Sequence, residues 1–214
     1  MYGRIFTPFA IGGFTIVPED HPEDPAAGLP LIMGKKGAFG SGEHETTASC
    51  LEEMERIPGI AGMRCLDLGS GTGILAVAAI RLGAASVVAV DIDPKAAESC
   101  AANVRLNGME GRIFSVCGEL ASVGREPYDL LLANIYADIH LALAHEMVGL
   151  VRPGGWLILS GIPLQDKFDI QRRFRNLGCI EHDWQILEEY VTIVLRKPDA
   201  EGDEMIDEKA ASSL

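Results

Sequence analysis

The run Asp67-Leu-Gly69-Ser-Gly71-Thr-Gly73 has the residue types and the spacing of a turn that binds a cofactor. An apolar stretch typical of a strand precedes it at 63–68, and an apolar segment typical of a helix follows at 74–82. Glycines between a strand and a helix let the backbone approach a bound nucleoside closely, and backbone amides at the start of the helix can face that ligand. The run therefore predicts a site for a nucleoside-type cofactor.

The glycine spacing differs from the spacing of dinucleotide sites. A dinucleotide turn reads Gly-x-Gly-x-x-Gly and holds a pyrophosphate at the N-terminus of a helix. Here Gly73 comes one position early, and Asp67 precedes the first glycine by two residues. A carboxylate at that place suits a cofactor with a positive group, such as an ammonium, and repels a pyrophosphate. Asp91, at the end of the next predicted strand, can accept hydrogen bonds from ribose hydroxyls in either class. An NAD oxidoreductase is thus the disfavoured alternative.

Strand and helix patterns alternate along most of the chain. A first helix is predicted from residue 43 to Pro58. The strands that follow are predicted at 63–68, 86–90, 112–117, 128–133, 156–160, 179–184 and 191–196, and the helices at 74–82, 94–107, 138–150 and 165–177. The loop between the last two strands is too short for a crossover helix, so we expect that pair to be antiparallel. The alternation predicts an α/β fold with a doubly wound, mostly parallel sheet.

Three regions are expected. Residues 1–38 are rich in glycine and proline, with a strand-like segment at 9–17 and a loop at 21–30, and predict a β-ribbon beside the core. Residues 39–197 form the α/β domain. Residues 198–214 carry six acidic residues and one lysine and predict a disordered tail.

Composition and charge exclude several classes of protein. The net charge of −13 does not attract phosphate backbones, which argues against nucleic acid and favours a basic protein partner. The N-terminus does not resemble a signal peptide, and no apolar run is long enough to span a membrane. Five widely spaced cysteines show no metal-ligand spacing. We therefore expect a cytoplasmic protein with mostly buried, reduced thiols, no metal site and no membrane association.

Four segments together resemble the class I methyltransferases that use S-adenosylmethionine. They are Asp67–Gly73, Asp91-Ile-Asp93, Leu132-Ala-Asn-Ile135 and Arg152-Pro-Gly-Gly155. A fifth segment, Ala38-Phe-Gly-Ser-Gly-Glu-His-Glu-Thr-Thr47, resembles the Phe-Gly-Thr-Gly-x-His-x-Thr-Thr segment of the bacterial enzymes that methylate the eleventh protein of the large ribosomal subunit. This resemblance covers roughly residues 30–197. It implies a Rossmann-like sheet of seven strands whose last strand is antiparallel.

The resemblance also implies a site. Asp67 would lie near the methionine ammonium of S-adenosylmethionine, and Asn134 would direct its side-chain oxygen at the acceptor amine as the catalytic residue. The residues that would bind the cofactor are Phe39, Gly40, Thr47, Asp67, Gly69, Gly71, Gly73, Asp91, Ile92, Glu119 and Asn134. Within the fifth segment, we interpret His44 as a residue that organises the loop through hydrogen bonds.

The chain departs from this family in two places. The ribosomal enzymes carry an N-terminal substrate-recognition domain, whereas about 38 residues precede Phe39 here, so we expect most of that domain to be lacking. Tyr136 and Asp138 would line the acceptor mouth where the family has small residues. The favoured function is N-methylation of a protein lysine or N-terminal amine. A small-molecule methyltransferase and a cofactor-binding protein without turnover are the alternatives.

Four aromatic side chains receive structural interpretations. His140 and His145 lie five positions apart on one predicted helix, which does not stack them on one face, so we expect surface or partly buried histidines. Trp156 and Trp184 lie in predicted strands, so we expect both in the core.

Overall fold

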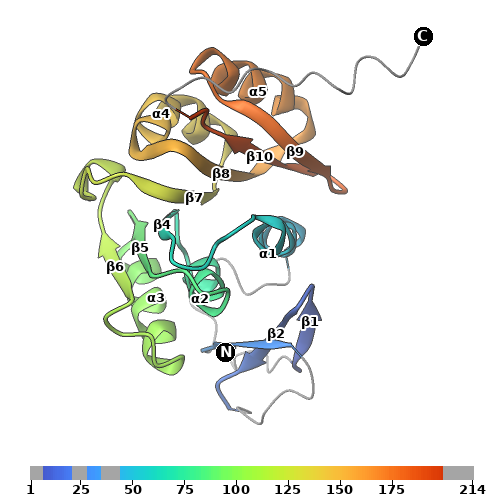
Figure 1. Ribbon diagram of the computed structural model, residues 1–214. Helices are drawn as coiled ribbons and strands as arrows, with labels where there is room; N and C mark the ends of the chain where they lie inside the picture. The colour runs from blue at the N-terminus through green and yellow to red at the C-terminus, as the bar shows by residue number, and fades with distance from the viewer. Residues whose placement is uncertain (1–6, 21–27, 35–43, 200–214) are drawn as a thin grey trace.

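The computed structural model describes residues 7–20, 28–34 and 44–199, which form two sheets and the helices that cover them (Figure 1). The large sheet has the strand order β6-β5-β4-β7-β8-β10-β9. Its strands are β4 (Arg64–Leu68), β5 (Ser86–Asp91), β6 (Ile113–Cys117), β7 (Tyr128–Asn134), β8 (Val151–Pro163), β9 (Ile180–Ile186) and β10 (Tyr190–Arg196). The helices are α1 (Glu45–Arg56), α2 (Ile74–Arg81), α3 (Pro94–Leu106), α4 (Ala137–Leu150) and α5 (Lys167–Asn176), with short 3-10 turns η1 (Leu120–Ser122) and η2 (Leu164–Asp166).

The direction of the strands confirms the predicted fold class. Strands β4 to β8 pair in parallel, and β10 pairs antiparallel with both β8 and β9. Because β10 opposes both neighbours, β9 runs in the same direction as β8. The hairpin that joins β9 to β10 therefore lies at the edge of the sheet where β4, β5 and β7 end, which is the edge that binds ligands in such folds.

Each face of the large sheet has its own core. Strand β7 illustrates the division, since Leu130 and Leu132 pack on one face and Leu131 and Ala133 on the other. Helices α1, α2 and α3 cover the first face, and α4 and α5 cover the second (Figure 1). This is the doubly wound arrangement that the alternation of strands and helices predicts.

The small sheet consists of β1 (Phe9–Ile11), β2 (Phe14–Pro18) and β3 (Leu29–Met33). Strands β1 and β2 pair antiparallel within the segment predicted as strand-like, and β2 pairs in parallel with β3. Phe14, Ile16, Leu31 and Met33 are buried in the same core as α1, α2 and α3. The small sheet is therefore packed against the first face of the large one.

The prediction of a loop at 21–30 was wrong for its last two residues. Residues 21–27 lie outside the described residues, but Leu29 and Pro30 belong to β3. Proline is tolerated there because β3 is an edge strand, where a missing backbone N–H need not break a ladder. Leu31 and Met33 point into the core and fix the strand. The expected boundary between residues 38 and 39 also falls outside the described residues, as does the predicted disordered tail 198–214 from residue 200 onward.

Candidate functional site

The glycine run forms a tight turn between β4 and α2. The backbone amides of Gly69 and Ser70 both donate to the carbonyl of Val90, at 2.9 and 3.1 Å, and Gly73 donates to Ser70 at 2.7 Å. Gly69 and Gly73 have φ of +71° and +77°, where side chains other than glycine are strained. A Cβ would also lie 2.3 Å from Ile135 Cγ2 at Gly69 and 2.5 Å from Cys100 Sγ at Gly73. Gly73 is the N-cap of α2, which accounts for its early position in the run.

Asp91 connects this turn to the start of α3. One carboxylate oxygen accepts from the Gly71 amide at 2.9 Å, and the other accepts from the Asp93 amide at 2.9 Å. Asp93 in turn caps α3 by accepting from Lys95 N at 2.9 Å. A carboxylate oxygen can accept more than one hydrogen bond, so Asp91 can hold the turn and still bind a ligand hydroxyl.

Asp67 is buried beneath the same turn. Its side chain is 1% exposed, and its Oδ2 has no hydrogen-bond partner among the described residues. Burial raises the pKa of this carboxyl to about 7, and the Asp91 carboxylate adds to the rise. A buried carboxylate with an unpartnered oxygen is unfavourable until a positive group joins it. The site therefore fits a ligand that brings a cation to Asp67.

Asn134, the last residue of β7, lies with one end of its amide held and the other end unpartnered. Its Nδ2 donates to the hydroxyls of Thr46 and Thr47 at 3.2 and 3.4 Å. Its Oδ1 is buried and has no partner among the described residues. The next residue, Ile135, packs against Gly69 of the glycine turn. The backbone that follows Asn134 therefore lies beside the turn.

The start of α1 provides the two hydroxyls. His44 is the N-cap of α1, and its side chain accepts from the Thr46 backbone amide. His44 Nδ1 also lies 2.8 Å from Thr46 Oγ1. The His44 and Tyr190 rings pack edge to face, with 5.4 Å between their centroids. His44 thus makes the kind of hydrogen bonds expected of it at the start of α1, while the loop that precedes it lies outside the described residues. Both Thr46 and Thr47 are 1% exposed.

His140 lies on α4 and shares a hydrogen-bond acceptor with the backbone that follows Asn134. The expectation that His140 is at the surface or partly buried was wrong. It is fully buried, and Nε2 donates to the Ser160 carbonyl at 2.9 Å, which also accepts from Ile135 N at 3.2 Å. Burial lowers the pKa of the imidazole to about 4, so it is neutral at pH 7. The spacing Ala137, His140, Ala144 is a helical stripe, and this signal could have placed His140 in the core.

Trp184 corrects a second expectation, whereas Trp156 is buried as predicted. Trp184 is 43% exposed and carries Lys167 Nζ 3.2 Å from the centre of its ring. It lies on β9, which is the edge strand, so only one neighbour covers it. The cysteines were expected to be mostly buried and reduced. All five are free thiols, and four are buried, with Cys117 the exposed one.

Most of the predicted cofactor residues meet at the carboxyl ends of β4, β5 and β7. The structure brings together Thr47, Asp67, Gly69, Gly71, Gly73, Asp91 and Asn134. Ile92 follows Asp91 and is 72% exposed, and Glu119 is exposed at the end of β6. Phe39 and Gly40 lie outside the described residues. Thr46 and Ser160 are additional members that sequence reasoning did not name.

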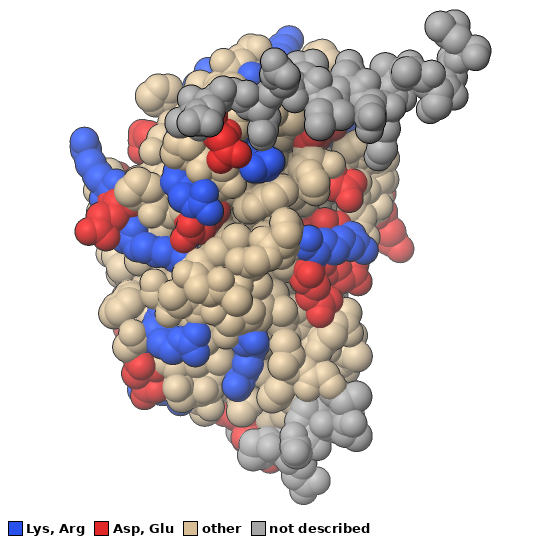
Figure 2. All heavy atoms as spheres, in the orientation of Figure 1, with Lys and Arg blue, Asp and Glu red and all other residues tan. Residues whose placement is uncertain are grey.

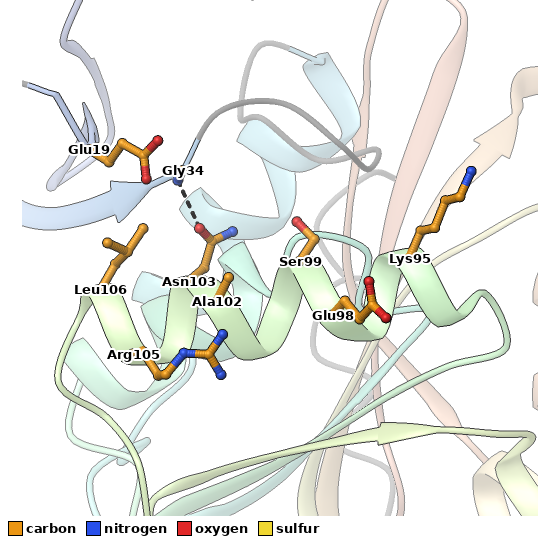
Figure 3. Close-up of a pocket in the computed structure, with 9 residues that line it drawn as sticks. All are labelled: Glu19, Gly34, Lys95, Glu98, Ser99, Ala102, Asn103, Arg105 and Leu106. Carbon is orange, nitrogen blue, oxygen red and sulfur yellow. Dashed lines mark hydrogen bonds between the residues drawn. The ribbon is translucent and has the colours of Figure 1, made fainter.

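Other features of the described structure lie apart from these residues. A cavity of about 580 Å³ runs along α3 and is lined by none of the predicted site residues (Figure 3). On the face drawn in Figure 2, Lys and Arg side chains are scattered among acidic ones. Within residues 7–20, 28–34 and 44–199, no group of three or more His, Cys, Asp or Glu side chains could hold a metal ion. None of the helices in this part of the chain has the length and apolar character needed to cross a bilayer.

Comparisons with known proteins agree with this geometry. The model of the family "Ribosomal protein L11 methyltransferase (PrmA)" matches residues 2–198. The ribosomal protein L11 methyltransferase of Geobacillus kaustophilus is 37% identical over 187 residues, covering 86% of this chain and 60% of that protein. The Deinococcus radiodurans enzyme of the same name is 42% identical over 161 residues, covering 72% of this chain and 59% of that protein. The chain thus spans about 60% of the length of these relatives.

Solved structures give the same result. A ribosomal protein L11 methylase from Lactobacillus delbrueckii subsp. bulgaricus superposes with a TM-score of 0.79 at 28% identity, covering 90% of this chain and all of that one. The cyclase SpnF superposes with a TM-score of 0.62 at 16% identity, which shows a shared fold alone. The match over residues 2–198 places this chain in the PrmA family of ribosomal protein L11 methyltransferases.

Proposed function

We propose that this protein is an S-adenosylmethionine-dependent N-methyltransferase that acts on a lysine or N-terminal amine of a protein, with a ribosomal protein as the leading candidate. The observation that carries the proposal is a pair of buried, unpartnered oxygens near the carboxyl ends of β4 and β7, Asp67 Oδ2 and Asn134 Oδ1, in a member of the PrmA family. One oxygen suits a cationic cofactor group, and the other suits an amine that donates a hydrogen bond.

The residues present fit the cofactor. S-adenosylmethionine, when bound, supplies a methyl group that its sulfonium already makes electrophilic. Asp67 would face the ammonium, because its unpartnered oxygen gains a cation there. Asp91 would accept from the ribose hydroxyls at the end of β5. The backbone at Gly69 and Gly71 would lie against the ligand, where a side chain would block its approach.

Asn134 would orient the acceptor. A lysine with an ordinary pKa of about 10.4 is mostly protonated at pH 7, yet only the neutral amine can attack a methyl group. An amide oxygen accepts an N–H of the amine without competing as a nucleophile. Because Thr46 and Thr47 hold Nδ2, the oxygen end of the amide is the end left for the substrate. The protein then contributes mainly alignment and exclusion of water.

Charges around the acceptor side support a cationic substrate. The hairpin between β9 and β10 lies at the same edge of the sheet as Asn134, and its exposed residues Glu188 and Glu189 are acidic. The Glu45 carboxylate accepts from both of their backbone amides, at 2.9 and 3.3 Å, which fixes the hairpin against the start of α1. Asp138 is exposed at the start of α4. These carboxylates favour a lysine-rich protein segment over a phosphate backbone.

A transfer assay tests the function. The protein is incubated with methyl-labelled S-adenosylmethionine and either purified ribosomal protein L11 or a cell lysate, and labelled species are identified by mass spectrometry. We expect label on a lysine or N-terminal amine of a protein. Label only in small molecules would support the metabolite enzyme, and binding of S-adenosylhomocysteine with no transfer to any acceptor would support a protein without turnover.

Substitution of Asn134 separates its role from cofactor binding. Asn134→Ala should lower kcat by about 100-fold through loss of alignment, while the Kd for S-adenosylhomocysteine changes less than about threefold. Asn176→Ala, at the exposed end of α5, is the matched control and should keep full activity. Equal turnover of Asn134→Ala and the wild type would remove Asn134 from the mechanism.

A further inference from the structure

The buried amide of Asn103, on α3, connects two parts of the molecule that are distant in sequence. Its side chain is 3% exposed. Its Nδ2 donates to the carbonyl of Thr72, in the glycine turn, at 2.8 Å. Its Oδ1 accepts from the backbone amide of Gly34, just after β3, at 2.8 Å, and Figure 3 shows this bond. One amide group therefore spans the gap between the small sheet and the turn.

A second amide, that of the C-cap residue Asn107 at the end of α3, makes a different set of bonds. Asn107 Oδ1 accepts from Ile32 N at 3.1 Å, and Asn107 Nδ2 donates to Ile32 O at 2.7 Å. The free edge of β3 is thus paired with α3 side chains in place of another strand. Among the described residues, the Asn107 side chain makes no hydrogen bond to the glycine turn, whereas the Asn103 side chain bonds both to that turn and to Gly34.

The bond to Thr72 acts on one particular peptide unit. The carbonyl of Thr72 and the amide of Gly73 belong to the same planar group. Asn103 holds the carbonyl end, and the Ser70 carbonyl holds the amide end at 2.7 Å. A glycine-rich turn has unusual backbone freedom, so its conformation depends on such restraints. Holding both ends of this group resists rotation of the peptide plane at the point where the turn enters α2.

We propose that Asn103 is a positioning residue for the cofactor turn, and that through it the small sheet supports cofactor binding. The proposal rests on the proposed function, since it takes S-adenosylmethionine as the ligand of the turn. Asn103 acts through Thr72 and does not touch the ligand. Its loss should loosen the turn and weaken binding of the cofactor, while the alignment of the acceptor by Asn134 stays intact.

The test compares Asn103→Asp with Asn107→Leu. The aspartate keeps an oxygen for Gly34 N–H but replaces the donor to Thr72 with a second oxygen. We expect Asn103→Asp to raise the Kd for S-adenosylhomocysteine and the KM for S-adenosylmethionine about tenfold, which corresponds to the loss of one hydrogen bond of about 1.4 kcal/mol. The kcat at saturating cofactor should stay within threefold of the wild type. Asn107→Leu should lower Tm while changing that Kd less than twofold.

A measurement on the wild type covers the case in which Asn103→Asp does not fold. The Nδ2 signals of Asn103 and Asn107 are followed by NMR as S-adenosylhomocysteine is added, and only the Asn103 signal should shift and exchange more slowly. Wild-type binding by Asn103→Asp, equal weakening in Asn107→Leu, or an unmoved Asn103 signal on saturation would overturn the proposal. A wild-type protein that does not bind S-adenosylhomocysteine would instead refute the proposed function, and the role of Asn103 would fall with it.

Discussion

Replacing Asp67 with asparagine should stabilise the ligand-free protein at neutral and alkaline pH. The substitution keeps the size of the side chain and removes its ionisation. In the folded protein, burial raises the pKa of the Asp67 carboxyl to about 7, whereas an aspartate in the unfolded chain ionises near 3.9. Between these two values the folded state keeps a proton that the unfolded state has released. The free energy of unfolding therefore falls as pH rises from about 4 to about 7, and the fall levels off above 7.

The size of this change in stability follows from the shift in the pKa of Asp67. A difference of about three pKa units, at about 1.4 kcal/mol each, gives a loss of about 4 kcal/mol from pH 4 to pH 8. Asp67→Asn should lack this loss. Urea unfolding of both proteins at pH 5, 6, 7 and 8 should show a stability difference in favour of the variant that grows by about 1.4 kcal/mol per pH unit up to pH 7. A difference that stays constant with pH would refute the assignment of the raised pKa to Asp67.

Cofactor binding should respond in the opposite direction. If the ionised Asp67 faces an ammonium, the Kd for S-adenosylhomocysteine should fall about tenfold for each unit by which the pH rises toward 7, and should stay level above pH 7. Calorimetry over the same pH series measures this, and Asp67→Asn should bind more weakly with a flat pH profile. Together the two experiments separate a carboxylate that is merely buried from one that is buried in order to meet a cation.

Two further substitutions test the residues that pack against Asn134 and Ile135. Gly161→Ala should cost about 1–3 kcal/mol of stability and lower kcat about tenfold, with little change in the Kd for the cofactor. The reason is that Gly161 has φ of +73°, and a Cβ there would lie 2.6 Å from Ile135 O and 3.0 Å from Asn134 Oδ1. Thermal unfolding and steady-state kinetics check this, and an unchanged kcat would contradict it. His140→Gln should remove an acid sensitivity, because the folded pKa of about 4 lies below the unfolded value of about 6.5 and the wild type loses about 3 kcal/mol as pH falls through that window. Parallel stability curves for wild type and His140→Gln between pH 7 and pH 4 would rule this out.

The regular elements of the large sheet could be predicted because their signals are local. Helix α3 begins with Pro94 in its first turn and ends at Leu106, with Asn107 as its C-cap before Gly108. Each of these signals depends only on neighbouring residues. Strand β3 could not be predicted in this way. Its Leu-Pro-Leu-Ile-Met sequence resembles a loop after several prolines. It becomes a strand because β2 pairs with one side, Asn107 binds Ile32 on the other, and Asn103 holds Gly34 just after the strand.

The same distinction explains which members of the site could be found from the sequence. Asp91 and Asn134 end parallel strands, and Asp67 is the last residue but one of another. Parallel strands end at one edge of the sheet, so the meeting of these side chains follows from the order of the elements. Of the residues that hold them, Thr47 and Gly71 belong to segments that the sequence also predicts. Asn103 and His140 follow no such rule, because each reaches the site from the side of a helix. Substitutions of the strand-end residues should therefore act on the ligand directly, and substitutions of Asn103 or His140 should act through the backbone that those residues restrain. A support of this kind becomes visible only when a buried polar atom is traced to its partner.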